Sequence, residues 1–219
     1  YYSISTVEQL FAWYNRRNYL KGCSGMSRKK KITLEDLFKH THQLLMTTGY
    51  DQFTFGILAD HLNVSRTAIY KYYSNKDELI NDYLTFKMKR FLQDFEEMEW
   101  SDDVEEHFKQ MFQLIFDYSD IHHLSNVFLQ KLSLQGKSLK DDENVSDLLH
   151  DIVLNHIKTF IVKGKDQGYF NASIPTSLLI SMIFHSVMIV DRSGLTSSER
   201  AGYIHEILAN GMLQKKINV

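Results

Sequence analysis

The sequence predicts an all-α protein, with an N-terminal three-helix domain that contains a helix-turn-helix and a larger C-terminal helical domain. The 219 residues include one Pro and ten Gly, which is too few for the turn-rich connections of most β architectures. Apolar residues recur at three- and four-residue intervals along most of the chain, as in amphipathic helices. Residues 54–79 add the third observation, because two short helical patterns with capping residues flank a tight turn there.

The first helix of the N-terminal domain is expected to begin at Thr33, with Asp36 three residues later in an imperfect capping box. Gly49 is expected to end this helix, because glycine readily adopts the left-handed conformation of a C-terminal cap. The apolar residues between these ends form one predicted core face: Leu34, Leu37, Phe38 and Leu45.

The helix-turn-helix is expected over about residues 54–73. Thr54 can cap its first helix, and Asn63 can adopt the left-handed conformation that ends it. Ser65 is then expected to cap the second helix through its hydroxyl oxygen. At about 100° per residue, Ile69 and Tyr73 point back at the first helix, so the opposite face of the second helix is free for a partner.

That free face and the adjoining caps carry side chains that suit duplex DNA. Arg and Lys can reach phosphates or guanine edges, and Thr can meet a base edge or a thymine methyl. The next helix, capped by Asn75, offers backbone N–H groups at its first turn, which favour a phosphate. A merely solvated basic helix is the alternative. The predicted DNA-binding residues are Thr54, Ser65, Arg66, Thr67, Ala68, Tyr70, Lys71, Tyr72 and Lys76.

The charges are distributed unevenly along a chain whose net charge is −2. Residues 28–79 hold eight Lys or Arg against six Asp or Glu, whereas residues 80–219 hold fourteen against twenty. A basic N-terminal part orients a molecule toward a polyanion. The run Arg28-Lys29-Lys30-Lys31 precedes the first helix, where an arm could reach phosphates or a minor groove. A solvated basic stretch is the other interpretation of this run.

The stretch from about Thr33 to Leu79 resembles the DNA-binding domain of the tetracycline-repressor (TetR) family of bacterial transcription regulators. Asn63 stands where the family usually has Gly, Thr67 replaces its small residue, and Tyr72-Tyr73 replaces its common His-Phe pair. The resemblance implies a dimeric regulator, a repressor, that binds a palindromic operator and is released by a small apolar or amphipathic effector. The matching residues are Gly49, Phe53-Thr54, Leu58-Ala59, Val64-Ser65, Ile69-Tyr70, Tyr73 and Asn75-Lys76-Asp77-Glu78-Leu79.

The chain is therefore divided into three parts. Residues 1–27 are interpreted as an N-terminal extension of uncertain origin, because Met26-Ser27-Arg28 looks like a more natural protein start. Residues 28–79 are the predicted DNA-binding domain, and residues 80–219 the predicted effector-binding and dimerisation domain. A continuous helix is expected from Asn75 toward Trp100.

The last two predicted helices, which start near Pro175 and Ser197, indicate a homodimer. The first of them is apolar almost all round, and a helix apolar on every side must be covered on every side. Ala201 and Gly202 are small enough to permit a close approach of helices. By the resemblance, these helices pair with their copies across a two-fold axis. Two recognition helices about 34–36 Å apart would then read successive major grooves. A monomer with a large core is the alternative.

Aromatic and Met side chains of the C-terminal part are candidates for an effector pocket. Residues of this kind at helical spacing more often form core, although Met adapts to varied shapes. The resemblance places the effector among these helices. The predicted effector-binding residues are Phe91, Phe95, Phe108, Met111, Phe112, Phe128, Phe160, Met182 and His185.

Motifs of other functional classes are incomplete in this sequence. His205-Glu206 begins a zinc-protease pattern, but Ala209 stands where the second His is needed. No metal, cofactor, enzymatic activity or membrane span is expected, and a lone Cys23 suits a reducing, cytoplasmic location. Two alternatives stay open: an all-α interaction scaffold or enzyme, and a DNA-binding regulator controlled by a protein coactivator without a small-molecule effector.

Overall fold

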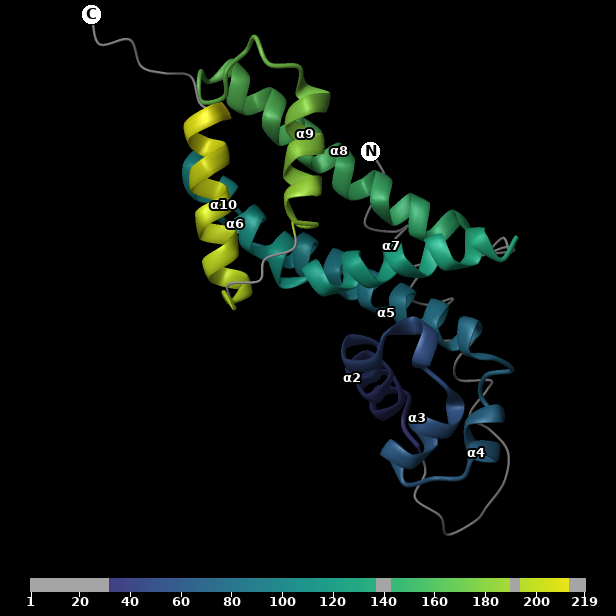
Figure 1. The fold of residues 1–219 in the computed structure, drawn as a ribbon. Coiled ribbons are helices and arrows are strands. Elements are labelled where there is room, and N and C mark those ends of the chain that lie inside the picture. Colours follow the sequence, from purple (N-terminus) through teal and green to yellow (C-terminus); the bar gives the residue numbers. More distant parts are fainter. Residues whose placement is uncertain (1–31, 137–142, 190–193, 213–219) are drawn as a thin grey trace, which may run out of the picture. The chain divides into compact units, whose positions relative to one another are not determined.

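The computed structural model describes residues 32–136, 143–189 and 194–212, and this part of the chain consists of α-helices joined by loops (Figure 1). The predicted all-α class is confirmed. The N-terminal extension and the basic run at residues 28–31 lie outside the described residues. The helices are α2 (Leu34–Gln52), α3 (Phe55–Leu62), α4 (Arg66–Tyr70), α5 (Lys76–Glu97), α6 (Val104–Asp117), α7 (Ser119–Leu134), α8 (Glu143–Asp166), α9 (Thr176–Ser186) and α10 (Ser197–Met212).

The chain divides into two compact units, and α5 and α7 each contribute residues to both. The first unit comprises Tyr1–Lys89 and Val127–Lys140, and the second comprises Arg90–Asn126 and Asp141–Val219. In the first unit α3 packs on α2 and on α4. In the second unit α10 packs on α6, and α9 packs on α8 (Figure 1).

Helix α2 begins as the sequence predicts and breaks at the predicted residue. The Thr33 hydroxyl accepts a hydrogen bond from the Asp36 backbone N–H at 3.0 Å. Gly49 has a φ of 73°, a conformation that favours glycine, and a short further stretch of helix then runs to Gln52. This break turns Tyr50 into the interior of the first unit, where its side chain is buried.

The core of the first unit contains most of the predicted apolar face of α2. Leu37, Phe38 and Leu45 are buried as expected, whereas Leu34, predicted on the same face, is only half-buried. Phe55 and Leu58 of α3 are also buried. Each fully buried side chain of this size contributes about 1.5–3 kcal/mol relative to an exposed one.

The second unit has an aromatic core built from α6 and α8. Helix α6 is capped by Asp103, whose carboxylate accepts from the Glu106 backbone N–H at 2.9 Å. Phe108 is fully buried, and its ring lies 5.3 Å from that of Phe170, which follows α8. Together with Phe160 these rings fill the space between the two helices.

The helices of the second unit include one glycine whose size matters and begin where the sequence indicates. Gly164 lies inside α8, where a Cβ atom would come within 2.5 Å of the Phe170 ring. The residue must therefore be small because Phe170 approaches it closely. Pro175 occupies the N-cap position of α9, so this helix starts near Pro175 as expected. Helix α10 begins at Ser197, as predicted.

Candidate DNA-binding face and effector pocket

The N-cap of α3 and the turn at Asn63 position the short helix α4. The Thr54 hydroxyl accepts from the Ile57 backbone N–H at 3.3 Å, which fixes the start of α3. Asn63 adopts the predicted left-handed conformation, with φ 53° and ψ 47°, and its N–H bonds to the Ala59 and Asp60 carbonyls. Ser65 occupies the N-cap position of α4, but its side chain makes no capping hydrogen bond, so that expectation is wrong. The turn is therefore set by backbone conformation at Asn63.

The two faces of α4 separate as the sequence predicts. Ile69 and Tyr73 are buried against the first unit, with exposed fractions of 0% and 2%. Arg66, Thr67 and Lys71 are exposed on the other side. Because the buried face fixes the rotation of the helix, the exposed face is held in one orientation.

The remaining predicted DNA-binding residues lie around this face. Thr54 and Ser65 are exposed, and Ala68 and Tyr72 are half-buried. Tyr70 is 54% exposed, and its ring is held edge-to-face against Phe55 with 5.0 Å between the centroids. An aromatic side chain anchored in this way has little conformational freedom left to lose when it binds a partner.

Glycine at position 56 shapes the surface beside Arg66. A Cβ atom at Gly56 would lie 3.5 Å from the Arg66 side-chain Nε and 3.6 Å from the Thr54 hydroxyl. The Arg66 side chain therefore passes close to the first turn of α3. This brings the guanidinium and the Thr54 hydroxyl to neighbouring positions on one exposed surface.

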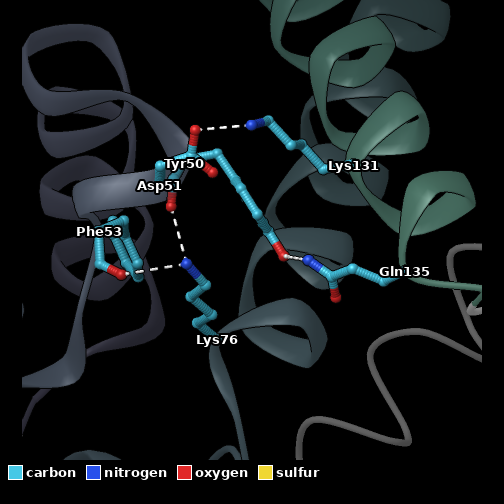
Figure 2. Close-up of polar contacts among 6 residues, drawn as sticks. All are labelled: Tyr50, Asp51, Phe53, Lys76, Lys131 and Gln135. Carbon is cyan, nitrogen blue, oxygen red and sulfur yellow. Dashed lines mark hydrogen bonds and ion pairs between the residues drawn. The ribbon is translucent and has the colours of Figure 1, made fainter.

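Lys76 points away from solvent, which differs from the free phosphate-binding cation that the sequence suggested. Its ammonium donates to the backbone carbonyl oxygens of Tyr50 at 2.8 Å and of Phe53 at 3.4 Å (Figure 2). It also lies 4.1 Å from the centre of the Tyr50 ring. These carbonyls end α2, which has no basic residue in its own last turn. Lys76 supplies the cation that the C-terminal end of a helix favours.

Tyr50 is the centre of a polar network inside the first unit that sequence reasoning missed. Its hydroxyl donates to the Asp77 carboxylate at 2.7 Å. The side-chain amide of Gln135 lies 3.5 Å from the same hydroxyl oxygen (Figure 2). Lys131 pairs with Asp51 at 2.6 Å. Burial and the Asp77 bond raise the pKa of Tyr50 to about 12, so the hydroxyl stays a donor. The partners are too far apart in sequence for any local pattern to indicate them.

The predicted effector residues do not all lie together. Six are buried aromatic or Met side chains of the second unit, and Phe91 and Phe95, for example, have ring centres 5.8 Å apart. Phe128 belongs to the first unit, where its ring lies 6.0 Å from that of Tyr50. Met182 and His185 are exposed on α9. The buried six are Phe91, Phe95, Phe108, Met111, Phe112 and Phe160.

A cavity of about 140 Å³ opens beside Phe160 in the second unit. Its polar lining comes from residues that sequence reasoning did not single out, among them His107, His156 and Lys163. The lining residues between His156 and Gly164 recur at helical spacing, and this pattern in the sequence could have predicted that they share one wall of the cavity. Among the described residues, no group of three or more His, Cys, Asp or Glu is arranged to hold a metal ion.

Residues 37–83 match the family model described as bacterial regulatory proteins, tetR family. Over these residues the chain is similar to members of this family. The matched segment covers α3 and α4 and most of α2, which are the elements that carry the predicted DNA-binding face. No curated protein matches the sequence.

Solved structures of transcriptional regulators share the fold over more than four fifths of the chain. The ketosteroid transcriptional regulator KstR2 of Mycobacterium tuberculosis is 16% identical with a TM-score of 0.64, over 87% of this chain and 100% of that one. A TetR transcription regulator from Haloarcula marismortui ATCC 43049 is 23% identical with a TM-score of 0.57, over 83% of this chain and 98% of that one. FadR from Bacillus subtilis, solved with stearoyl-CoA, is 17% identical with a TM-score of 0.56, over 82% of this chain and 99% of that one. These likenesses confirm the predicted helix-turn-helix domain followed by a helical domain.

The family consists of transcription regulators and not of enzymes, which agrees with the sequence-based expectation. None of the helices in the described part of the chain is long and apolar enough to cross a membrane.

Proposed function

We propose that the protein is a dimeric repressor that binds a palindromic operator through α4 and leaves it when a small effector binds the second unit. The observation that carries this proposal is the division of α4 into a fully buried face at Ile69 and an exposed face with Arg66, Thr67 and Lys71. A helix held in this way can place its exposed side chains in the major groove. Residues 28–79 then form the DNA-binding domain and residues 80–219 the effector and dimerisation domain.

The last two helices support the dimer. Tyr203 and Ile207 of α10 are 57% and 69% exposed, and Leu178 and Met182 of α9 are also exposed. Large apolar side chains that are exposed on two consecutive helices suit a surface that a partner covers. A second copy of the chain that covers α9 and α10 would bury them and would present two α4 helices to successive grooves.

The cavity in the second unit favours control by a small molecule over control by a protein coactivator. A closed body without voids would have suited the coactivator, whereas this unit contains a cavity of about 140 Å³. An effector that binds one body shape better than another shifts the population toward it. We propose that the favoured shape tilts α5, so that the two α4 helices no longer fit consecutive grooves. A DNA-bound role places the protein in the cytoplasm.

The proposed DNA binding is tested by selecting bound sites from genomic fragments with the purified chain. We expect a palindromic sequence, with an affinity that falls with salt by a log–log slope of about −0.9 per phosphate contact. Arg66→Ala and Lys71→Ala should each weaken binding by about 1–3 kcal/mol if these side chains touch bases. Lys158→Ala, an exposed lysine of α8, is the matched control and should leave the affinity unchanged. Affinity that is insensitive to salt, or equal in all three variants, would refute the α4 interface.

A further inference from the structure

The cavity beside Phe160 has two walls of different origin within the second unit. One wall is a single face of α8, where the lining residues recur at intervals of three and four. The other wall comes from the segment before α6 and from the first turn of α6. The Ser101 backbone N–H donates to the Gln110 side chain at 3.0 Å, which ties this segment to α6. The lining residues that matter below are His156, Phe160 and Lys163 on α8, and Ser101, Asp102 and His107 opposite.

The size and walls of the cavity suit one aromatic ring. Its volume of about 140 Å³ is close to that of a protein cavity, about 150 Å³, that holds one benzene molecule. The His107 ring lies 4.4 Å from the Phe160 ring and stacks on Trp100 at 4.7 Å with 14° between the planes. His107 is therefore held between aromatic neighbours, and a guest ring would meet the edges of His107 and Phe160, which both line the cavity.

His107 carries a buried nitrogen without a hydrogen-bond partner. Its ring bonds to the Ser101 backbone through one nitrogen, and the buried Nε2 has no partner. Burial and the nearby Lys163 charge lower the pKa of His107, so the ring is neutral at pH 7. Since Nε2 has no partner, we assign the bond with the Ser101 backbone to Nδ1 as the donor, and Nε2 is then a free acceptor. Such an atom is costly to leave unpaired, and a ligand that donates to it would remove the cost.

The cavity also lacks an anion. Lys163 is exposed and makes no ion pair with any described residue, and its charge acts on the neighbouring imidazole of His107. Burial and the proximity of His107 also lower the pKa of His156. The lowered pKa values keep both imidazoles neutral at pH 7, so Lys163 supplies the positive charge at the cavity. A bound carboxylate would give its ammonium an ion-pair partner.

We propose that this cavity binds a monocyclic aromatic carboxylate with a hydroxyl or amino substituent, and that this compound is the effector of the repressor. The ring lies against Phe160 and His107, the carboxylate pairs with Lys163, and the substituent donates a hydrogen bond to His107 Nε2. The binding site follows from the cavity alone. Its regulatory role rests on the function proposed above.

Binding is tested with the full chain carrying Trp13→Phe, so that Trp100 is its remaining tryptophan and reports on the His107 stack. We expect 4-hydroxybenzoate to change the Trp100 fluorescence saturably. Benzoate, which lacks the donor, should bind about fivefold more weakly. Phenol lacks the carboxylate and should bind about tenfold more weakly or worse.

Single substitutions test each proposed contact between the ligand and the cavity. Lys163→Met should lose about tenfold in affinity for 4-hydroxybenzoate, while Lys158→Met, on another face of α8, should not change it. His107→Phe keeps a ring between Trp100 and Phe160 but removes the acceptor, so benzoate and 4-hydroxybenzoate should bind it equally. Absence of saturable binding up to about 10 mM in folded protein would overturn the site, as would equal losses in both lysine variants.

The proposed role of this ligand as the effector is tested by a separate measurement of DNA binding. 4-Hydroxybenzoate should release the wild-type protein from the selected genomic fragment, and Lys163→Met should bind the same fragment but resist release. If the ligand binds and the DNA affinity does not change, the effector role is wrong while the site stands. If no duplex is bound at all, the proposed repressor fails, and the fluorescence titration still decides the cavity.

Discussion

Replacing Lys76 by Met separates a structural role of this lysine from a role in DNA binding. The change removes an ammonium that donates to the Tyr50 carbonyl at 2.8 Å and the Phe53 carbonyl at 3.4 Å. A hydrogen bond from a charged donor contributes about 1.5–3 kcal/mol, and the contact with the Tyr50 ring adds about 0.5–1 kcal/mol. Since the bond to Phe53 is long and Lys76 is half-buried, we expect the free energy of unfolding to fall by about 2–3 kcal/mol in total.

Thermal unfolding followed by circular dichroism measures this loss. For a chain of this length each kcal/mol corresponds to about 2–4 °C, so Lys76→Met should lower the Tm by about 4–12 °C. Lys71→Met is the matched control, because Lys71 is exposed and a surface substitution of this kind stays within about 0.5 kcal/mol.

DNA binding should show the opposite pattern in the same two variants. Measured well below either Tm, Lys71→Met should reduce the salt slope of operator binding by about one contact, whereas Lys76→Met should leave the slope unchanged. A Lys76→Met protein with the wild-type Tm and a reduced slope would refute the reasoning. It would mean that the ammonium leaves the two carbonyls and reaches a phosphate.

Four further predictions follow from single features of the structure. Gly164→Ala should destabilise by up to about 2 kcal/mol in denaturant titration, because overpacking against Phe170 costs about 1–3 kcal/mol and the gain in helix propensity returns about 1. Asn63→Val should cost about 1–2 kcal/mol in the same assay and Asn63→Gly almost nothing, since only the former is strained at φ 53°. Because the pKa of His156 is lowered, its unfolded form binds protons more readily, so the Tm should fall as the pH drops below about 6.5, and less so in His156→Phe. Ile207→Glu should give monomers in sedimentation experiments without lowering the Tm of the monomer, and a persistent dimer would refute the α10 interface.

Features that depend on neighbours in sequence could be predicted. The caps at Thr33, Thr54 and Asn75 form their expected hydrogen bonds, because each joins a side chain to an N–H three residues later. Asn63 is left-handed and Ile69 is buried for equally local reasons. Ser65 is the local exception: its backbone takes the cap conformation, but its hydroxyl makes no capping bond.

Features that depend on distant partners could not be predicted. The carbonyls that hold Lys76 belong to residues 26 and 23 positions earlier, and Lys131 pairs with Asp51 across 80 positions. His107 faces Phe160 from another helix. Helical periodicity identifies which side of a helix is apolar, but it carries no information about which other helix covers that side. The cavity and the Tyr50 network both arise from such pairings.

The same long-range contacts explain how a helix as short as α4 can serve as a recognition element. A helix of five residues is not stable alone, because the free energy needed to nucleate it exceeds the free energy gained from one turn of hydrogen bonds. The conformation of α4 must therefore be imposed by its surroundings: the buried Ile69 and Tyr73 on one side, the left-handed Asn63 before it, and the start of α5 after it. Lys76 fixes that start to the end of α2. A change at Lys76 should thus disturb α4 without touching its exposed face, and stability and DNA affinity would be coupled through the elements that hold the helix.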